Sequence, residues 1–318
     1  MTFFGYCAYN PILITLKVHY FLNHWLIEIG VHLLKNIVNW LKFIFFVMIN
    51  RRKFSLTPLK IYPLLEVYSM RENITIEKLM QISKVARRFR KLIDNPIRVK
   101  LIRVGRKQDG GYLIPKLHYS AGISIGIGQE ISFETSPQLK DTSIAMFDHT
   151  INFDNVIKNK PLNLKFFQLG LGDKNSSQIK TLSEIKRLSG LDFKNLVFIK
   201  IDIEGNELQS LQNCDLNEFA AIIIELHWLE NIFYSDKLQK FEHILNILTD
   251  KHQIVNAHVN NFGKLFNVGN IILPDVIELS LIRTNLVASI SINEKSFFKN
   301  RQKNSPCRLD FPEIWPFQ

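Results

Sequence analysis

Phe198-Ile-Lys-Ile-Asp-Ile-Glu-Gly-Asn-Glu-Leu208 is the stretch that best indicates the fold, because an apolar run ends there in acids and a glycine. The run begins at Val197, and up to Ile203 only Lys200 and Asp202 interrupt a series of apolar residues. A short, nearly continuous apolar run of this kind is typical of a strand buried on both faces of a parallel sheet. The stretch therefore predicts an α/β fold.

The acids at the end of this strand indicate a site. Burying a carboxylate without partners costs several kcal/mol, so Asp202 and Glu204 are poor core residues. Ligands of open α/β sheets bind beyond the carboxyl ends of the strands, which is where both acids are expected. Gly205 permits a tight turn into a helix that we expect to begin near Asn206.

Strand and helix signals alternate from Val99 onward, the pattern of a parallel sheet. The last two expected strands are not separated by a long helix and can form an antiparallel hairpin at the sheet edge. We therefore predict a doubly wound, mostly parallel seven-stranded sheet of Rossmann-like type, preceded by a basic helix over 74–92. The expected strands cover residues 123–127, 144–147, 164–169, 197–203, 221–226, 254–259 and 276–282.

Charge is distributed unevenly along the chain. Residues 1–107 carry 19 Lys and Arg against 5 Asp and Glu, whereas the other 211 residues carry 21 against 24. The formal net charge of +11 therefore comes from the N-terminal third. This pattern favours an appendage that meets an acidic surface over a nucleic-acid enzyme with a basic active site. An anionic membrane surface is the preferred partner, and RNA is the less favoured alternative.

Residues 11–49 are strongly apolar but carry a polar stripe at helical spacing. A Glu or Lys in the middle of a membrane costs about 2.5–3.5 kcal/mol, so a helix lying in the membrane interface is preferred over a spanning one. The basic residues 51–53 can hold anionic headgroups. A helix packed on the protein itself and a signal anchor remain the alternatives. The stripe consists of Lys17, His24, Glu28, His32, Lys35, Asn39 and Lys42.

Composition divides the chain into three expected parts. Residues 1–53 form an amphipathic helical appendage, residues 54–98 a linker with the basic helix, and residues 99–318 the sheet domain. The cysteines are odd in number and far apart, which favours a reducing, cytoplasmic location, with peripheral attachment to the membrane through residues 1–53. No metal-ligand spacing is found, and no metal site is expected. The cysteines are Cys7, Cys214 and Cys307.

A glycine turn follows the first strand of the sheet. Gly126 and Gly128 let the backbone turn sharply and approach a ligand closely, with a helix N-terminus expected nearby. The third glycine of the dinucleotide fingerprint is absent, since Ile131 stands in its place. Asp148 ends the next strand, where an acid can accept hydrogen bonds from both hydroxyls of a ribose. That geometry serves NAD and S-adenosylmethionine alike.

The next three strands also end in polar residues. Asp173 follows the third strand, Asp202 and Glu204 follow the fourth, and Glu225 and His227 end the fifth. Five consecutive strands thus present glycines or polar side chains at the same edge. The set predicts a cofactor cleft there.

These motifs together resemble those of the FkbM-type methyltransferases, within the class I S-adenosylmethionine-dependent fold. The resemblance covers about residues 103–283, and residues 200–207 are its most specific part. One departure is Asn206, which stands where the family motif often has a histidine. The motifs are Asp109–Pro115, Ser124–Gly128, Phe147–Thr150, Leu169–Asp173, Lys200–Glu207, Ile224–His227 and His258–Gly263.

The resemblance implies transfer of a methyl group from S-adenosylmethionine, usually to a hydroxyl of a sugar or another small metabolite. By this analogy Gly126, Gly128 and Asp148 hold the methionine and ribose parts of the cofactor. Asp173 lies near the adenine, and Asp202 faces the amino acid part or the reaction centre.

A hydroxyl acceptor loses its proton as it gains the methyl group, so a positioned base assists the transfer. The candidates are Glu204, His227 and His258. The residues expected to meet the acceptor are Asp109, Tyr112, Asn260 and Asn261, of which the two amides suit sugar hydroxyls.

Two other readings stay open. An NAD-dependent oxidoreductase or epimerase would use the same early strands, although the third glycine of the dinucleotide fingerprint is absent. A non-catalytic binding module is the other, and Asn206 is the residue that keeps it open.

Overall fold

The computed structural model describes residues 76–106, 110–152, 161–233, 235–260, 263–268 and 271–290. The chain divides into two compact units, residues 1–79 and 80–318. Only residues 76–79 of the first unit are described. The expected appendage over 1–53 and the linker up to residue 75 lie outside the described residues, and their boundary stays a prediction.

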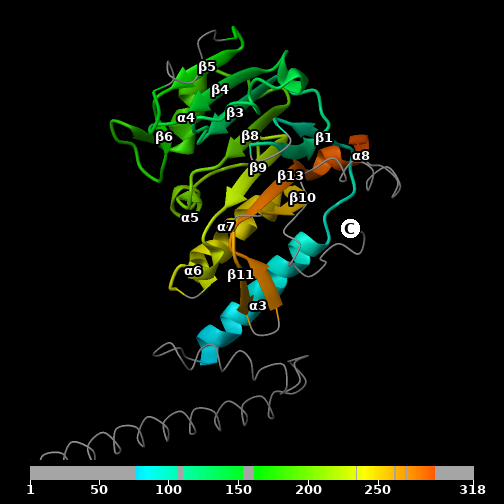
Figure 1. The fold of residues 1–318 in the computed structure, drawn as a ribbon, viewed down its shortest axis with the longest axis vertical. Helices are drawn as coiled ribbons and strands as arrows, with labels where there is room; N and C mark the ends of the chain where they lie inside the picture. Colours follow the sequence, from blue (N-terminus) through cyan, green and yellow to red (C-terminus); the bar gives the residue numbers. More distant parts are fainter. Residues whose placement is uncertain are drawn as a thin grey trace, which may run out of the picture. The chain divides into compact units, whose positions relative to one another are not determined.

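A seven-stranded sheet forms the second unit, and its strand order is β10-β13-β9-β8-β3-β4-β5 (Figure 1). The five strands from β9 to β5 are parallel neighbours. The predicted mostly parallel α/β sheet is therefore confirmed. In chain order the strands are β3 (Ala121–Ile125), β4 (Ser143–Phe147), β5 (Leu164–Phe167), β8 (Val197–Ile201), β9 (Ala221–Leu226), β10 (His252–Val259) and β13 (Ile277–Arg283).

The antiparallel hairpin is also present, with a topology that the sequence did not specify. Strand β13 runs antiparallel to both β9 and β10 and is inserted between them. Strand β10 is therefore the edge strand, two positions away from β9. The connection between β10 and β13 contains a small ribbon of β11 (Leu265–Val268) and β12 (Ile271–Pro274).

Two further ribbons flank the sheet, and the helices are mostly short. The ribbons pair β1 (Leu101–Val104) with β2 (Tyr112–Pro115), and β6 (Gly170–Leu171) with β7 (Ile179–Lys180). The helices are α3 (Ile76–Asp94), α4 (Leu182–Ser189), α5 (Glu207–Ser210), α6 (Leu229–Phe233), α7 (Leu238–Asp250), α8 (Val287–Ile290) and the 3₁₀ turns η2 (Pro137–Leu139) and η4 (Thr284–Leu286).

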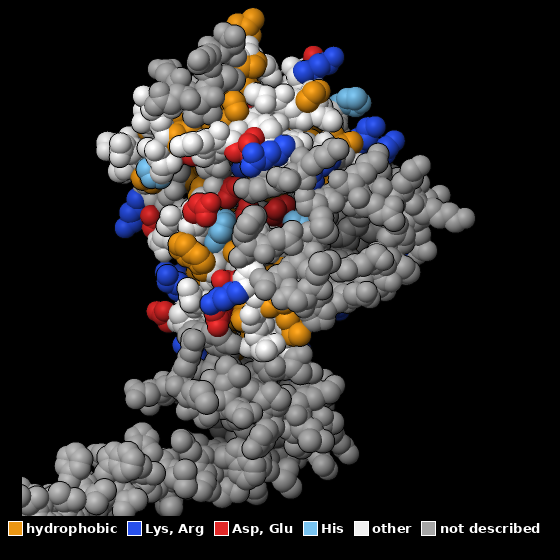
Figure 2. Space-filling model, in the orientation of Figure 1, with side chains coloured by type: hydrophobic (Ala, Val, Ile, Leu, Met, Phe, Trp, Pro, Cys, Tyr) orange, Lys and Arg blue, Asp and Glu red, His pale blue; other side chains and the backbone are white. Residues whose placement is uncertain are grey.

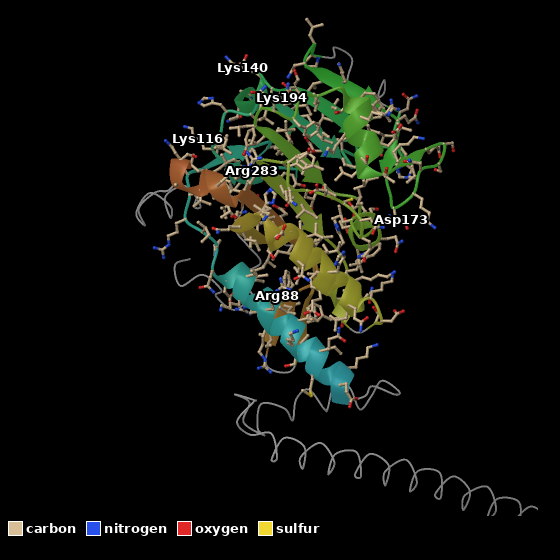
Figure 3. The ribbon with its side chains drawn as sticks, turned by 180° about the vertical axis from the view of Figure 1, so that it is seen from behind. Arg88, Lys116, Lys140, Asp173, Lys194 and Arg283 are labelled. Atoms are coloured by element: carbon tan, nitrogen blue, oxygen red, sulfur yellow. The ribbon has the colours of Figure 1, made fainter. Side chains whose placement is uncertain are left out.

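The predicted basic helix is α3, and from Met80 onward it packs along α7 (Figures 1 and 3). The rings of Phe89 and Phe241 meet edge to face with centroids 5.4 Å apart. Arg88, labelled in Figure 3, donates from Nη1 to Oδ1 of Asn246 at 2.7 Å. The apolar face of α3 is thus covered, while its cations bond to polar groups of α7.

The helix expected just after the glycine turn does not form. Residues 126–142 form turns and the 3₁₀ helix η2. Pro137 restrains the preceding residue to extended backbone, and Ser136 has φ −60° and ψ 137°. The proline therefore prevents an α-helix from continuing through this segment.

An aromatic chain fixes the centre of the sheet. Phe198 of β8 meets Tyr119 and Phe133 edge to face, and Phe133 meets Tyr112 in the same way. Gly122 of β3 leaves room for the Phe198 ring, which a Cβ at that position would overlap. This packing anchors Tyr112 at the carboxyl ends of the parallel strands.

Among the helices of the described part of the chain, none combines the length and apolar character needed to cross a membrane. The segment 11–49, for which an interfacial helix is predicted, lies outside the described residues.

Candidate active site

A cleft of about 900 Å³ opens at the carboxyl ends of β3, β4, β8 and β9. Cavities of roughly 300–1,000 Å³ are typical of small-molecule and cofactor sites. Figure 2 shows acidic side chains gathered beside histidine near the middle of one face. Two sets of residues line or support the cleft. We refer to Gly126, Gly128 and Asp148 as the glycine group, and to Asp202, Glu204, Glu207, Glu225 and His227 as the acidic group.

The glycine turn after β3 requires glycine at both positions for different reasons. Gly126 has φ +73°, and a Cβ there would overlap the carbonyl oxygen of Asp202. Gly128 has φ +56°, and a Cβ there would meet nothing within 4 Å. The first glycine allows close packing of two strand ends, and the second leaves bare backbone facing the cleft.

Asp148 is fixed by hydrogen bonds at the end of β4. Its Oδ2 accepts from the backbone N–H of Gly128 at 2.9 Å. Its Oδ1 accepts from the backbone N–H of Thr150 at 2.8 Å and from Oγ1 of the same residue at 2.6 Å. The side chain is buried with 5% of its surface exposed. A carboxylate has about four acceptor positions, so one remains for a ligand hydroxyl.

Asp173 follows β6 and is labelled in Figure 3 beside α5. Its Oδ2 accepts a hydrogen bond from Nε2 of Gln209 in α5 at 2.6 Å. Both residues line the cleft.

Asp202 lies at the end of β8, between a cation and a phenol. Its Oδ2 accepts from the hydroxyl of Tyr112 at 2.9 Å and lies 3.5 Å from Nζ of Lys200. The same Nζ lies 3.5 Å from the carbonyl oxygen of Gly126 and 5.2 Å from the centre of the Tyr112 ring. Burial and the charge of Asp202 raise the pKa of Tyr112 well above its usual value. Tyr112 is therefore a hydrogen-bond donor in this cleft.

Lys200 carries its charge although it is 5% exposed in the middle of the sheet. Burial lowers its pKa, but the charges of Asp202, Glu134 and Glu225 outweigh that effect and raise it. Glu134 is itself buried, and its Oε1 accepts from the hydroxyl of Ser124. Lys200 therefore serves as the cation beneath the acids of the cleft.

His227 follows β9 and is held by Glu207. Nδ1 of His227 lies 3.0 Å from Oε1 of Glu207. The same Oε1 accepts the backbone N–H groups of Ile203 and Gly205 at 3.2 and 3.1 Å. Glu207 is 2% exposed, so its carboxylate fixes both the turn after β8 and the orientation of the imidazole.

The other ring nitrogen of His227 faces two more carboxylates. Its Nε2 lies 3.5 Å from Oε2 of Glu204 and 3.9 Å from Oε1 of Glu225. Burial lowers the pKa of His227, but the hydrogen bond and charge of Glu207, with the charges of Glu225 and Asp202, raise it to about 9.

Glu225 is buried next to this histidine. Its Oε1 accepts from Nδ2 of Asn260 at 2.8 Å. Burial and the charges of Asp202 and Glu278 raise the pKa of Glu225 to about 8. The acidic group therefore holds more negative charge than its own cations neutralise.

Two residues with positive φ lie at the rim of this group. Glu204 has φ +52° and Trp228 has φ +54°, in a region that favours glycine. The Trp228 ring covers Gly205, where a Cβ would overlap ring carbons. Such backbone strain persists where the surroundings enforce it and is frequent at functional sites. The side chain of Glu204 is 83% exposed, so it can move to meet a ligand.

The structure brings most of the predicted site residues to one cleft, and their assigned roles stay predictions. His258 lies elsewhere: it pairs with Glu278 across β10 and β13, with Nδ1 3.4 Å from Oε1, and is not among the residues that line the cleft. The inserted strand β13 separates it from β9. Asp109 and Asn261 lie outside the described residues. The predicted residues that line the cleft are Tyr112, Gly126, Gly128, Asp148, Asp173, Asp202, Glu204, His227 and Asn260.

Sequence reasoning gave no individual role to four residues that the site depends on. Glu225 was expected at the cleft because it ends the fifth strand, and Lys200 could have been found as the one cation in an apolar strand. Glu207 lies in the predicted motif but its contact with His227 spans two strand ends. Nothing in the pattern singles out Trp228.

One set of side chains in the described part of the chain has the makeup of a metal site. Asp202, Glu204 and His227 each offer one ligand atom, and these atoms lie within 4.8 Å of one another.

Comparison with known families identifies the domain. The model of the methyltransferase FkbM domain family matches residues 123–255, which span β3 to the middle of β10. The predicted family is thus confirmed over residues 123–255. No curated protein matches the chain.

Two solved structures match the chain at low sequence identity and low TM-score. The plantazolicin methyltransferase BpumL, in complex with SAH, is 12% identical, with 71% of this chain and 93% of that chain covered and a TM-score of 0.29. The Methanococcus jannaschii fibrillarin pre-rRNA processing protein is 12% identical, with 58% of this chain and 82% of that chain covered and a TM-score of 0.34.

Proposed function

We propose that this methyltransferase FkbM domain transfers a methyl group from S-adenosylmethionine to a hydroxyl of a sugar or a related small molecule. The observation that carries the proposal is one cleft with two chemically different groups. The glycine group offers bare backbone and a fixed carboxylate, whereas the acidic group offers an oriented imidazole among carboxylates.

The glycine group fits the ribose and methionine parts of the cofactor. Gly128 leaves open space where a side chain would stand, and Asp148 keeps an acceptor position for a ribose hydroxyl. Asp173 lies farther along the cleft, where it would meet the adenine. When bound, S-adenosylmethionine supplies an electrophilic methyl group on a sulfonium, and its positive charge suits a cleft rich in carboxylates.

The acidic group fits the acceptor. Nδ1 of His227 is held by Glu207, so Nε2 is the ring nitrogen that faces Glu204 and the acceptor space. Glu204 would therefore help remove the hydroxyl proton as the new bond forms, and His227 would do so in its neutral form, which its raised pKa of about 9 makes the minor form near pH 7. Tyr112 and Asn260, which bond to Asp202 and Glu225, are placed to orient acceptor hydroxyls.

The polar lining of the cleft supports a hydroxyl-bearing acceptor, and a screen tests this proposal. The purified full chain is incubated with methyl-labelled S-adenosylmethionine and a panel of sugar nucleotides, free glycosides and lipid extracts. We expect label in a sugar-containing product, and none with His227→Gln. Label confined to protein or RNA, or none with any acceptor, would contradict the sugar assignment.

Calorimetric titration separates the enzyme classes. We expect the full chain to bind S-adenosylmethionine with one site per chain and to show no saturable binding of NAD. Tight NAD binding without S-adenosylmethionine binding would favour the oxidoreductase reading. Binding of S-adenosylmethionine without any methyl acceptor would favour the non-catalytic module.

Residues 1–53 carry a separate proposal that rests on sequence alone. Their basic charge and apolar composition favour docking on an anionic membrane surface. We expect the full chain to float with vesicles that contain phosphatidylserine, and a variant without residues 1–53 to remain behind. Equal flotation of the two proteins would refute this proposal.

A further inference from the structure

The acidic group contains a set of potential metal ligands that the sequence did not predict. Asp202 follows β8, Glu204 follows two residues later, and His227 follows β9, yet one ligand atom from each lies within 4.8 Å of the others. Two carboxylates and one imidazole form a mixed oxygen and nitrogen donor set. Carboxylates suit Mg²⁺ and Mn²⁺, and imidazole favours Mn²⁺ over Mg²⁺.

An independent observation concerns the orientation of the histidine. The His227 side chain is 8% exposed, and its Nδ1 is fixed by Glu207, whose side chain is 3% exposed. Histidines that bind metals usually donate their other ring N–H to a carboxylate or carbonyl, which fixes the tautomer and the ring. The contact of Glu207 with His227 has this form, and it aims Nε2 at the exposed acid Glu204.

One pair of donor atoms is farther apart than a direct hydrogen bond. Nε2 of His227 lies 3.5 Å from Oε2 of Glu204. Hydrogen bonds between such groups are about 2.7–3.2 Å long. Two neighbouring ligand atoms of an octahedral ion at about 2.1 Å lie roughly 3 Å apart, so a small movement of Glu204 would let the pair share an ion. Because Glu204 is 83% exposed, it can adjust to complete the coordination.

We propose that Asp202, Glu204 and His227 bind a divalent cation of the Mn²⁺ or Mg²⁺ class, and that this ion positions the acceptor hydroxyl of the proposed methyl transfer. The reaction role rests on the proposed function, whereas binding of the ion does not. The ion polarises the hydroxyl, whose oxygen bonds to the methyl carbon. The carbon–sulfur bond breaks with its electron pair going to sulfur. Because His227 and Glu204 then ligate the ion, the hydroxyl proton passes to the carboxylate of Glu225, whose Oε1 lies 3.9 Å from Nε2 of His227.

Manganese titration of the full chain tests the site without any acceptor. The protein is stripped with EDTA, freed of chelator, and titrated with Mn²⁺ while free Mn²⁺ is followed by electron paramagnetic resonance. We expect one saturable site per chain, weakened at least tenfold by His227→Gln. His243→Gln is the matched control, because His243 is exposed on α7 and bonds to the carbonyl oxygen of Gln212.

Glu204→Gln keeps the test decisive if the His227 variant does not fold. Glu204 is exposed, so its variant should fold like the wild type and still lose Mn²⁺ affinity. Absence of a saturable site in the wild type would overturn the proposal. Equal affinity in the wild type and in Glu204→Gln would also overturn it, as would equal loss in His227→Gln and His243→Gln.

A failure of the proposed ion site can be distinguished from a failure of the proposed methyl transfer. Asp148→Asn should lose S-adenosylmethionine affinity and keep the Mn²⁺ site. A wild type that binds S-adenosylmethionine but not Mn²⁺ refutes the ion alone. A wild type that binds Mn²⁺ but not S-adenosylmethionine refutes the proposed function and leaves the ion site standing.

Discussion

The glycine group and the acidic group share one cleft but are stabilised in different ways. In the glycine group, Asp148 accepts hydrogen bonds from the backbone of Gly128 and Thr150. In the acidic group, side chains from two strand ends hold one another, and the pKa values of Glu225 and His227 are both raised. The first group is satisfied by local backbone, whereas the second keeps an excess of negative charge.

This difference suggests a division of labour. A backbone-bonded carboxylate is already satisfied and is suited to hold an uncharged part of a ligand, such as a ribose. A crowded set of acids is stabilised by any cation that arrives, whether a sulfonium or a metal ion. The two groups meet where Gly126 packs on the carbonyl oxygen of Asp202. Because the side chains of the two groups have different hydrogen-bond partners, changes in one group should still be separable from changes in the other.

The largest effect is expected for His227→Gln. Loss of the imidazole should lower turnover by about 10³-fold, within the range for a positioned acid–base or metal-binding group. The affinity for S-adenosylmethionine should change by less than about threefold, because His227 belongs to the acidic group. Steady-state kinetics with the acceptor from the screen, together with calorimetry, measure both. An equal loss of affinity for S-adenosylmethionine would show that the glycine group and the acidic group do not act separately.

The next largest effect is the loss of stability on changing the first glycine of the turn, Gly126, compared with that on changing the second, Gly128. Gly126→Ala should unfold the protein or destabilise it by more than about 3 kcal/mol, since the new methyl overlaps backbone and φ is positive. Gly128→Ala should cost only about 1–2 kcal/mol of stability, the cost of a left-handed residue, and still weaken S-adenosylmethionine binding. Denaturant unfolding and calorimetry separate the two. Equal destabilisation by both would contradict the account of Gly126.

A smaller effect is expected for Glu207→Gln. The amide oxygen can still accept the backbone N–H groups of Ile203 and Gly205, but it carries no charge to hold the imidazolium. Partners of this kind typically cost 10–100-fold in metal affinity or activity when they are changed. We expect a loss of this size in turnover, with Glu230→Gln, outside the acidic group, as the control. Unchanged turnover would show that Glu207 only caps the turn.

The smallest effect concerns the pH dependence of stability in metal-free protein. The folded pKa values of Glu225 and His227 are raised to about 8 and about 9, above the ordinary values of 4.5 and 6.5. Both groups then bind more protons in the folded state, so their contribution to stability is full at low pH. It is lost as pH rises through the folded pKa values.

Thermal unfolding in EDTA between pH 6 and 9.5 should show this loss. The wild-type melting temperature should fall across the range, and the fall should be shallower in Glu225→Gln. A wild-type curve that rises with pH, or an equal slope in the variant, would show that the acidic group is not strained by its own charge.

The fold was predictable because the strands are short apolar runs whose ends carry the site. The seven expected strands all form, within a few residues of their expected bounds. Insertion of β13 beside β9 was not predictable, since pairing partners depend on long-range contacts that apolar pattern does not encode. His258 was assigned to the site because its strand end looked like the others. The inserted strand separates it from β9.

The site was predictable in part for the same reason. Asp148 and the glycines act through local turns, and local turns leave a sequence signal. The contact of Glu207 with His227 joins residues that are 20 positions apart in the sequence. Trp228 has a positive φ, and its ring packs on Gly205 at the end of a different strand. Pro137 is the sequence signal against a helix after the glycine turn, and the prediction used the glycine pattern alone. Long-range side-chain contacts thus account for most of what sequence reasoning missed.

The most direct test of the central claim is a crossed titration of S-adenosylmethionine into three proteins: the wild type, Asp148→Asn and His227→Gln. Asp141→Asn serves as the control, since Asp141 is exposed at the opposite end of β4. The account predicts one site in the wild type, in His227→Gln and in the control, and at least a 30-fold loss in Asp148→Asn, the effect of about 2 kcal/mol for charge-assisted hydrogen bonds. No binding to the wild type, or equal affinity in Asp148→Asn, would contradict it.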